Sequence, residues 1–190
     1  MTPEYHSTTT LNRIRASHPC QDGWTKLLAH LGKTAADDEP LSLLTILDSN
    51  GMADALWCLD ADPALDRLKR HFQAWCAEQV VHLFEADQPG DTRVRDQIAM
   101  LRRDDASDAE RAAESAAAKD AASDAAWDAA RAAAWDAAWV AASPEAGAAA
   151  WVAARDAASP EASPEARAAA RAAAKDAQEK QLRAMLEAKR

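Results

Sequence analysis

The chain has 190 residues and a formal net charge of −9, and 48% of its residues are hydrophobic. This length allows one substantial hydrophobic core, or one core with a helical extension. No apolar run approaches the roughly 20 residues that cross a membrane, and residues 1–15 lack the apolar stretch of a secretory signal, so we expect a cytoplasmic protein.

The first hundred residues have the composition of an ordinary helical protein. Apolar residues recur at helical spacing in segments that end at a glycine or at a turn. In chain order they predict helices at 20–32, 40–50, 52–59, 64–84 and 92–103, with a turn at 88–91. The small number of glycines argues against a turn-rich β fold. We therefore expect an all-α fold that begins with a compact bundle of short helices.

The densest polar cluster of this region lies in the loop between the first two predicted helices. It consists of Lys33, Asp37, Asp38 and Glu39. Asp38 or Glu39 can cap the following helix and interact favourably with its dipole. The cluster can instead contact a partner protein, or bind a divalent cation through carboxylate oxygens. We take these four residues as candidate partner-binding residues and expect no metal site.

From residue 117 to residue 177 the sequence repeats every four residues without a break. One column of the repeat, from Ala118 to Ala174, is alanine at every step. Alanine has the highest helix propensity, so this region is predicted to be helical. Four residues turn a helix by about 400°, so each column drifts by roughly 40° per step. Either several neighbours surround such a helix, or the repeat is divided into shorter helices.

Three Ser-Pro-Glu sequences, at 143–145, 159–161 and 163–165, favour the division into shorter helices. Each matches an N-cap serine, a proline at the first helical position and an acid in the first turn. A proline inside a continuing helix would cost about 3 kcal/mol. We predict helices at 107–142, 144–158 and 164–188, packed antiparallel on the bundle, and domains at 1–105 and 106–190. A single kinked rod is the alternative.

The tryptophans of the repeat are expected to supply much of its buried area. They are Trp127, Trp135, Trp139 and Trp151. Indoles can pack across the shallow surfaces of alanine-rich helices, each burying up to about 250 Å². The alternative is that one or two of them are exposed anchors for a partner.

Charge is distributed unevenly along the chain. Residues 104–145 carry ten acids and three bases, a net charge of −7, whereas residues 146–190 carry +2. Direct nucleic-acid binding needs clustered bases, so we expect none. Four aspartates of the repeat remain candidates for contact with a partner, although a solvated face is the simpler interpretation. They are Asp120, Asp124, Asp128 and Asp136.

No sequence motif for catalysis accompanies these patterns. The three cysteines, Cys20, Cys58 and Cys76, have no paired spacing, and an odd count fits unpaired thiols in a reducing compartment. Cys58 and Cys76 lie on apolar faces, where a free cysteine acts as a small hydrophobic residue. A serine elbow and a complete phosphate-binding loop are both missing. We expect no enzyme activity and no cofactor.

A recognisable string of residues runs through the first half, in the segments 11–15, 19–20, 22–24, 31–34, 36–41, 51–59, 74–77 and 79–82. This string resembles the immunity proteins found in bacterial genomes and their phages. Members of that family commonly continue from such a helical head into an Ala/Trp/Arg/Asp-rich tail. The resemblance implies a protein that neutralises a toxin by binding it, and it implies no catalytic residues.

The leading hypothesis is therefore a non-enzymatic inhibitor that occludes a partner protein such as a toxin. The first alternative is a phage-encoded counter-defence protein of the anti-CRISPR kind, which blocks a nucleic-acid-binding complex. The second is a scaffold that self-associates through its Ala-rich helices. The acidic segment 104–145 would steer a basic partner and raise the association rate.

Overall fold

The computed structural model describes residues 4–79, 81, 82, 85, 88–117 and 164–188. The chain divides into two compact units, Met1–Lys69 with Glu179–Arg190, and Arg70–Gln178. The described residues are mainly helical, which confirms the predicted all-α class. The predicted domains 1–105 and 106–190 stay a prediction, since much of the second lies outside the described residues. No described helix is long and apolar enough to cross a membrane.

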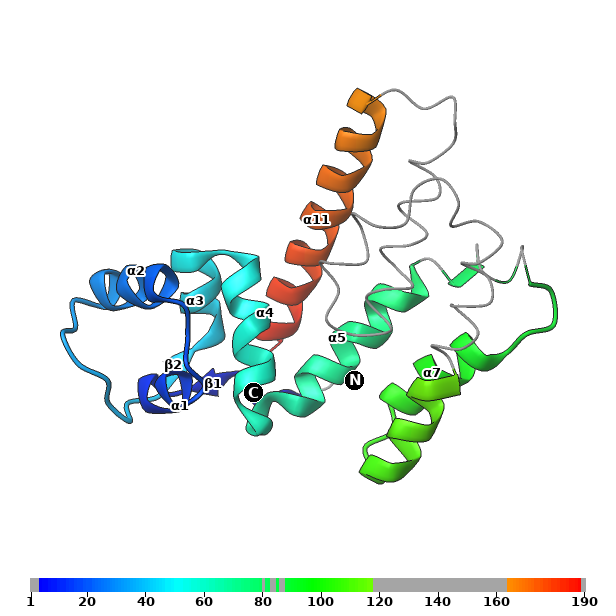
Figure 1. Cartoon of the computed structure of the whole chain (residues 1–190), viewed down its shortest axis with the longest axis horizontal. Helices are drawn as coiled ribbons and strands as arrows, with labels where there is room; N and C mark the ends of the chain where they lie inside the picture. The colour runs from blue at the N-terminus through cyan, green and yellow to red at the C-terminus, as the bar shows by residue number, and fades with distance from the viewer. Residues whose placement is uncertain (1–3, 80, 83–84, 86–87, 118–163, 189–190) are drawn as a thin grey trace. The chain divides into compact units, whose positions relative to one another are not determined.

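The first unit contains a set of short helices and one two-stranded ribbon (Figure 1). Before residue 66 its elements are β1 (Thr8–Thr9), α1 (Leu11–Ala16), α2 (Gln21–Leu31), β2 (Leu41–Ser42), α3 (Leu43–Asn50), α4 (Met52–Ala61) and the 3-10 turn η1 (Pro63–Leu65). The end of α11 (Pro164–Glu187) also belongs to this unit. The strands are antiparallel, with Thr8 opposite Ser42 and Thr9 opposite Leu41. Helix α3 packs against both α2 and α4, and α1 packs against α4.

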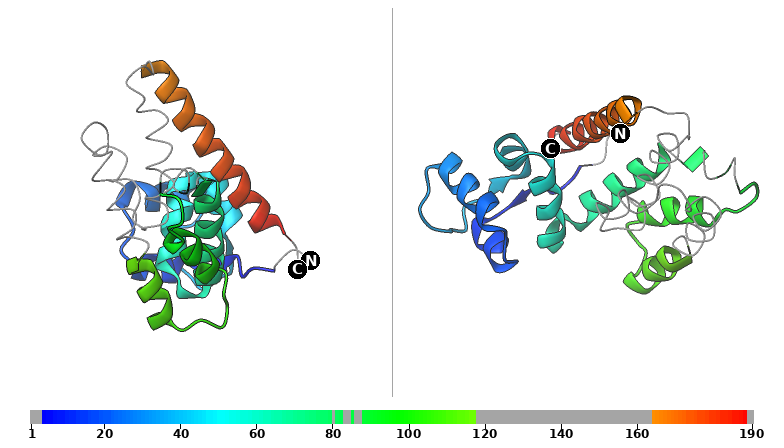
Figure 2. Two further views of the ribbon diagram at one scale, coloured as in Figure 1. Left: turned by 90° about the vertical axis from the view of Figure 1, so that its right-hand side faces the viewer. Right: turned by 45° about the horizontal axis from the view of Figure 1, so that its top comes forward.

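Two predicted helix ends are confirmed at glycines. Helix α2 ends at Gly32, which adopts a left-handed conformation with φ of 64°. Helix α3 ends at Gly51, whose φ of 93° suits glycine and lets α4 begin directly afterwards. Figure 2 shows the same succession of short helices from two further directions.

The predicted start of the helix at residue 40 was wrong. Leu41 pairs with Thr9 in the ribbon, so the backbone at residues 41–42 is extended. The Ser42 hydroxyl accepts a hydrogen bond from the Leu44 backbone N–H at 3.1 Å and caps α3. The sequence also gave no indication of α1, whose N-cap is Thr10, or of the ribbon.

A buried carboxylate joins the N-terminal segment to the end of α4. Asp62 is 3% exposed, and its Oδ2 accepts hydrogen bonds from the Thr9 hydroxyl at 2.8 Å and from Arg13 Nη1 at 3.0 Å. Its Oδ1 accepts from the Ala64 backbone N–H at 3.0 Å. This last bond, followed by Pro63 at the first helical position, forms the turn η1.

Helix α5 (Asp66–Glu78) begins in the first unit and continues into the second. The helix predicted over 64–84 is therefore replaced at its start by η1, and α5 itself ends at Glu78. The predicted turn at 88–91 is confirmed, with Gly90 at a φ of 94°. Helix α7 (Arg93–Leu101) follows it.

The second unit has its own small core, made by α5 and α7. Buried side chains of both helices form it: Ala74, Ala77, Val94, Ile98 and Leu101. Arg70 is 7% exposed, and its Nη1 donates to the Leu101 carbonyl at 2.8 Å and to the Arg103 carbonyl at 3.2 Å. The guanidinium thus satisfies backbone carbonyls at the end of α7, which the helix itself leaves unpaired.

Two elements of the predicted Ala-rich region lie within the described residues. A helix covers 108–117, and Ser107 and Glu110 form reciprocal cap hydrogen bonds at its start. Helix α11 (Pro164–Glu187) begins at a proline, as predicted. The predicted helix 144–158, the remainder of 107–142 and the four tryptophans of the repeat lie outside the described residues.

Candidate functional site

The acidic loop predicted from the sequence forms a compact ion cluster. Lys33 Nζ lies 2.5 Å from Asp37 Oδ2 and 2.7 Å from Glu39 Oε2. The hydrogen bond from Lys33 lowers the pKa of Asp37, and the two carboxylates raise the pKa of Lys33. Asp38 lies beside this cluster and is exposed. The structure therefore brings together three of the four candidate residues of this loop, and their ion pairs stabilise the conformation of the loop.

The helix-capping interpretation of this loop was wrong, because Ser42 caps α3. A partner-binding role for Lys33, Asp37, Asp38 and Glu39 stays a prediction. Among the described residues, no cluster of His, Cys, Asp and Glu side chains is arranged to hold a metal ion. The other four candidates, Asp120, Asp124, Asp128 and Asp136, lie outside the described residues.

The three cysteines occupy two kinds of environment. Cys58 and Cys76 are buried, and burial raises the pKa of each thiol to about 12. This confirms their expected role as small hydrophobic residues. Cys20 is exposed and caps α2, with its Sγ accepting a hydrogen bond from the Gly23 N–H at 3.4 Å.

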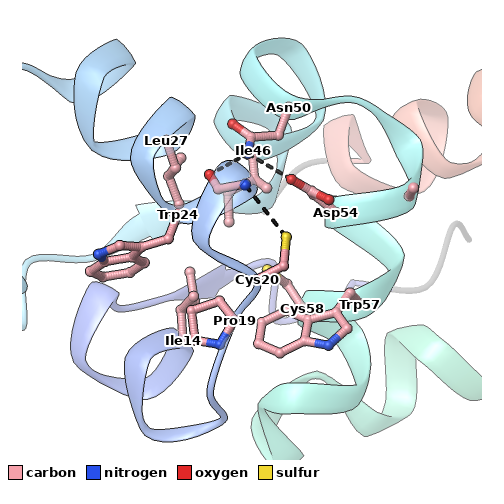
Figure 3. A pocket seen from close by; sticks show the side chains of 12 residues that line it. Ile14, Pro19, Cys20, Trp24, Leu27, Ile46, Asn50, Asp54, Trp57 and Cys58 are labelled. Atoms are coloured by element: carbon pink, nitrogen blue, oxygen red, sulfur yellow. Dashed lines mark hydrogen bonds between the residues drawn. The ribbon is translucent and has the colours of Figure 1, made fainter.

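A pocket of about 210 Å³ lies among α1, α2, α3 and α4, within the first unit. Its apolar wall is formed by side chains of these helices and of the segment before α2: Ile14, Pro19, Leu27 and Ile46. Trp24 of α2 and Trp57 of α4 also line it, and in Figure 3 their indoles lie on either side of Ile14 and Pro19. We call this the Trp pocket.

The local fold explains how the two tryptophans reach one pocket. In α2, Trp24 and Leu27 are three residues apart and share a face, and Leu27 is buried at 3% exposure. In α4, Asp54 and Trp57 are three residues apart and share a face, and both line the pocket. Trp57 is 36% exposed, and it is the large hydrophobic side chain left exposed among the described residues.

One wall of the Trp pocket is polar. Asn50 Nδ2 donates to the Gly23 carbonyl at 2.8 Å and to Asp54 Oδ2 at 2.7 Å, as the dashed lines in Figure 3 show. The Ser49 hydroxyl donates to Asn50 Oδ1 at 2.8 Å and orients the amide. Asparagine therefore links the first turn of α2 to the start of α4.

Gly23 allows the backbone of α2 to lie close to Asp54 of α4 at this wall. A Cβ atom at this position would lie 2.6 Å from Asp54 Oδ2 and 3.1 Å from Cys20 Sγ. Because glycine has no side chain, the Asp54 carboxylate can pack directly against the backbone of α2. Asp54 is half-buried, and within the described part of the chain it forms no ion pair.

The sequence patterns did not predict the Trp pocket. The tryptophans of the repeat were expected to pack, with one or two exposed anchors as the alternative, and Trp24 and Trp57 were expected only as apolar positions of helices. The available signals were a glycine followed by a tryptophan in the first turn of α2, and an aspartate three residues before Trp57 in α4. Neither is specific until the two helices are seen to face each other. The pocket offers an apolar surface, two indoles and one carboxylate, which is a set of groups suited to binding.

Comparisons of the chain with protein-family models, with curated proteins and with solved structures gave no match. The resemblance to bacterial and phage immunity proteins therefore stays a prediction that rests on the residues quoted above.

Proposed function

We propose that this chain is a non-enzymatic protein that binds and inhibits a partner protein by occluding it, as immunity proteins do. The observation that supports this proposal is the Trp pocket, an apolar recess with an exposed indole at its edge. Tryptophans in or beside such recesses are enriched among the residues that dominate the energetics of protein–protein interfaces.

The size of the pocket favours a protein partner over a cofactor. Sites for cofactors and drug-sized ligands usually have volumes of about 300–1,000 Å³. The Trp pocket has about 210 Å³. A dry cavity of about 150 Å³ is large enough for benzene. A single large side chain of a partner fits this range.

The charge of the chain favours a basic partner. The net charge is −9, and residues 104–145 alone carry −7. Opposite charge raises the rate of association and suppresses binding to acidic competitors. A basic toxin, such as a nuclease, would meet this requirement.

The test is the affinity of the full chain for the product of its neighbouring gene, measured by biolayer interferometry. Trp57→Ala should weaken binding by about 30-fold, which corresponds to a hot-spot loss of about 2 kcal/mol. Trp75→Ala is the matched control, because it removes an indole from the second unit. Its effect on the affinity of the folded protein should be less than about twofold. The association rate should fall as salt is added.

An unchanged affinity of Trp57→Ala for a partner that binds the wild-type chain would remove the Trp pocket from this proposal. Binding to a nucleic-acid-processing complex from a defence system, in place of the neighbouring gene product, would favour the counter-defence alternative. Self-association is measured in the same samples by light scattering.

A further inference from the structure

We infer that the Trp pocket takes an arginine side chain of the partner, with the guanidinium against an indole of the lining and paired with the Asp54 carboxylate. This inference rests on the proposed function and names the chemistry that the pocket recognises. It follows from the charge, the aromatic lining and the volume of the pocket, taken in that order.

Asp54 supplies a negative charge to the lining of the pocket. Its carboxylate lines the pocket, is half-buried and accepts a hydrogen bond from the neutral amide of Asn50. Asp54 also contributes to the raised pKa of Cys58, after the larger effect of burial, and Cys58 is another residue that lines the pocket. A half-buried carboxylate with a neutral partner is stabilised when a cation approaches, because the interaction is stronger where water is partly excluded.

The aromatic lining favours a guanidinium over an ammonium as the cation. A guanidinium is planar, weakly hydrated and stacks on aromatic faces, whereas an ammonium is compact and strongly hydrated. Tryptophan is the best aromatic partner for a cation. The pocket supplies two indoles and only one carboxylate, an arrangement that favours arginine over lysine.

The shape of the pocket suits a long side chain with an apolar stem. The apolar floor formed by Ile14, Pro19 and Leu27 suits the methylene stem of the side chain. The remaining volume of about 210 Å³ is that of one large side chain. A neutral aromatic or aliphatic side chain would also fill the space, but it would leave the Asp54 carboxylate without a counter-charge. The experiment therefore separates charge from shape.

The experiment titrates the full-length protein with N-acetyl-arginine methylamide and with its citrulline counterpart, which has a similar shape and no charge. Ionic strength is kept constant with sodium chloride. Binding is read from the indole N–H signals of Trp24 and Trp57 in NMR spectra, assigned with Trp24→Phe and Trp57→Phe. Both signals should shift and saturate with a millimolar dissociation constant, and citrulline should bind at least about fivefold more weakly.

Two variants with the same change in net charge show which carboxylate causes the preference for arginine over citrulline. Asp54→Asn should abolish the preference for arginine over citrulline. Asp22→Asn removes an exposed carboxylate of α2 that does not line the pocket, and it should retain the preference. Far-UV circular dichroism of each variant checks that the fold is intact.

Equal binding of the two probes would overturn the inference and assign the pocket to a neutral side chain. The absence of any shift at the two indoles up to about 50 mM probe would also overturn it. These results can be told apart from failure of the proposed function. Loss of partner binding in Trp57→Ala without an arginine preference leaves the inhibitor proposal standing. A preference for arginine in the absence of any protein partner would support the arginine site and contradict the inhibitor proposal.

Discussion

Gly23 marks a close approach of α2 to α4. An added Cβ would lie 2.6 Å from Asp54 Oδ2, a distance that requires the carboxylate to move. We expect Gly23→Ala to lower the free energy of unfolding by about 1–2 kcal/mol. Overpacking costs about 1–3 kcal/mol, and the better helix propensity of alanine returns at most about 1 kcal/mol. Urea denaturation measures the difference.

The control for this prediction is the same substitution in an Asp54→Ala background. The carboxylate is then absent, and Cys20 Sγ, at 3.1 Å, has to move by only a few tenths of an ångström. Gly23→Ala should now raise stability by about 0.5–1 kcal/mol. The change of sign is the coupling between the two positions. An equal loss in both backgrounds would mean that the approach of Asp54 is not the cause.

Asp62 makes the stability of the first unit depend on pH. Burial raises the pKa of this carboxyl, but hydrogen bonds from Thr9, the Ala64 backbone and Arg13 outweigh burial and lower it below its usual range. A carboxyl with a lowered folded-state pKa stabilises the protein above its unfolded-state pKa of about 3.9. This contribution is lost as the pH falls through the folded-state value.

We therefore expect Asp62→Asn to lose about 1.5–3 kcal/mol of stability at pH 7, the usual range for hydrogen bonds to a charged group. The pH values 5 and 3 lie above and below the unfolded-state pKa of about 3.9. When the pH is lowered from 5 to 3, the free energy of unfolding should fall less in the variant than in the wild type. Urea denaturation at the two pH values measures both effects. Asp60→Asn is the matched control, since it neutralises an exposed carboxylate of α4 that pairs with Lys69. A parallel pH response in Asp62→Asn and the wild type would contradict the assignment.

At the scale of elements, the last turns of α11 belong to the core of the first unit. Leu182 is 1% exposed and Met185 is 7% exposed, and Arg183 Nη1 lies 2.7 Å from Asp48 Oδ1. Leu182→Ala should lower the free energy of unfolding by about 2–4 kcal/mol. Arg183→Ala should cost less than about 1 kcal/mol, because both partners of its ion pair are substantially exposed. Denaturation of the full chain compares the two.

Lys180→Ala is the control for these two variants, since Lys180 is exposed on the same helix. It should leave stability unchanged within about 0.5 kcal/mol. If Leu182→Ala behaves like Lys180→Ala, the buried position of the helix end is wrong. If Arg183→Ala is the more damaging variant, the helix end is held by charge and not by apolar packing.

Local signals predicted those elements whose ends depend on local chemistry. Pro164 starts α11 and Gly32 ends α2 because proline and glycine act through their own backbone geometry. The start of α3 could not be predicted in this way, since Leu41 is extended only because Thr9, 32 residues earlier, pairs with it. Helix α1 has six residues, too few to show a period.

The same distinction applies to the candidate site. The cluster of Lys33, Asp37 and Glu39 was predicted because its members lie within seven residues of one another. The Trp pocket draws its walls from Ile14 through Cys58, on four helices. Its existence depends on how α2, α3 and α4 pack, and that packing includes a close approach at Gly23 and a hydrogen bond from Asn50, which no periodicity reveals.

At the scale of the whole molecule, the two units should open separately, because each has buried side chains of its own. Hydrogen exchange followed by mass spectrometry tests this in the intact chain. Ile98→Ala removes a core residue of the second unit and should accelerate exchange in α7, by about 30-fold or more if it costs at least 2 kcal/mol. Leu182→Ala should accelerate exchange in α2, α3 and α4 instead.

Helix α5 gives this prediction its sharpest form, because the division between the units falls within it, after Lys69. Amides that follow Arg70 should respond to Ile98→Ala, since Ala74 and Ala77 belong to the same core as Ile98. Amides before that point should respond to Leu182→Ala. Equal acceleration of every helix by both variants would mean that the chain unfolds as one cooperative body. A response that changes midway along a single helix has only one explanation here: the hydrogen-bonded backbone is continuous, while the side chains that stabilise it belong to two cores.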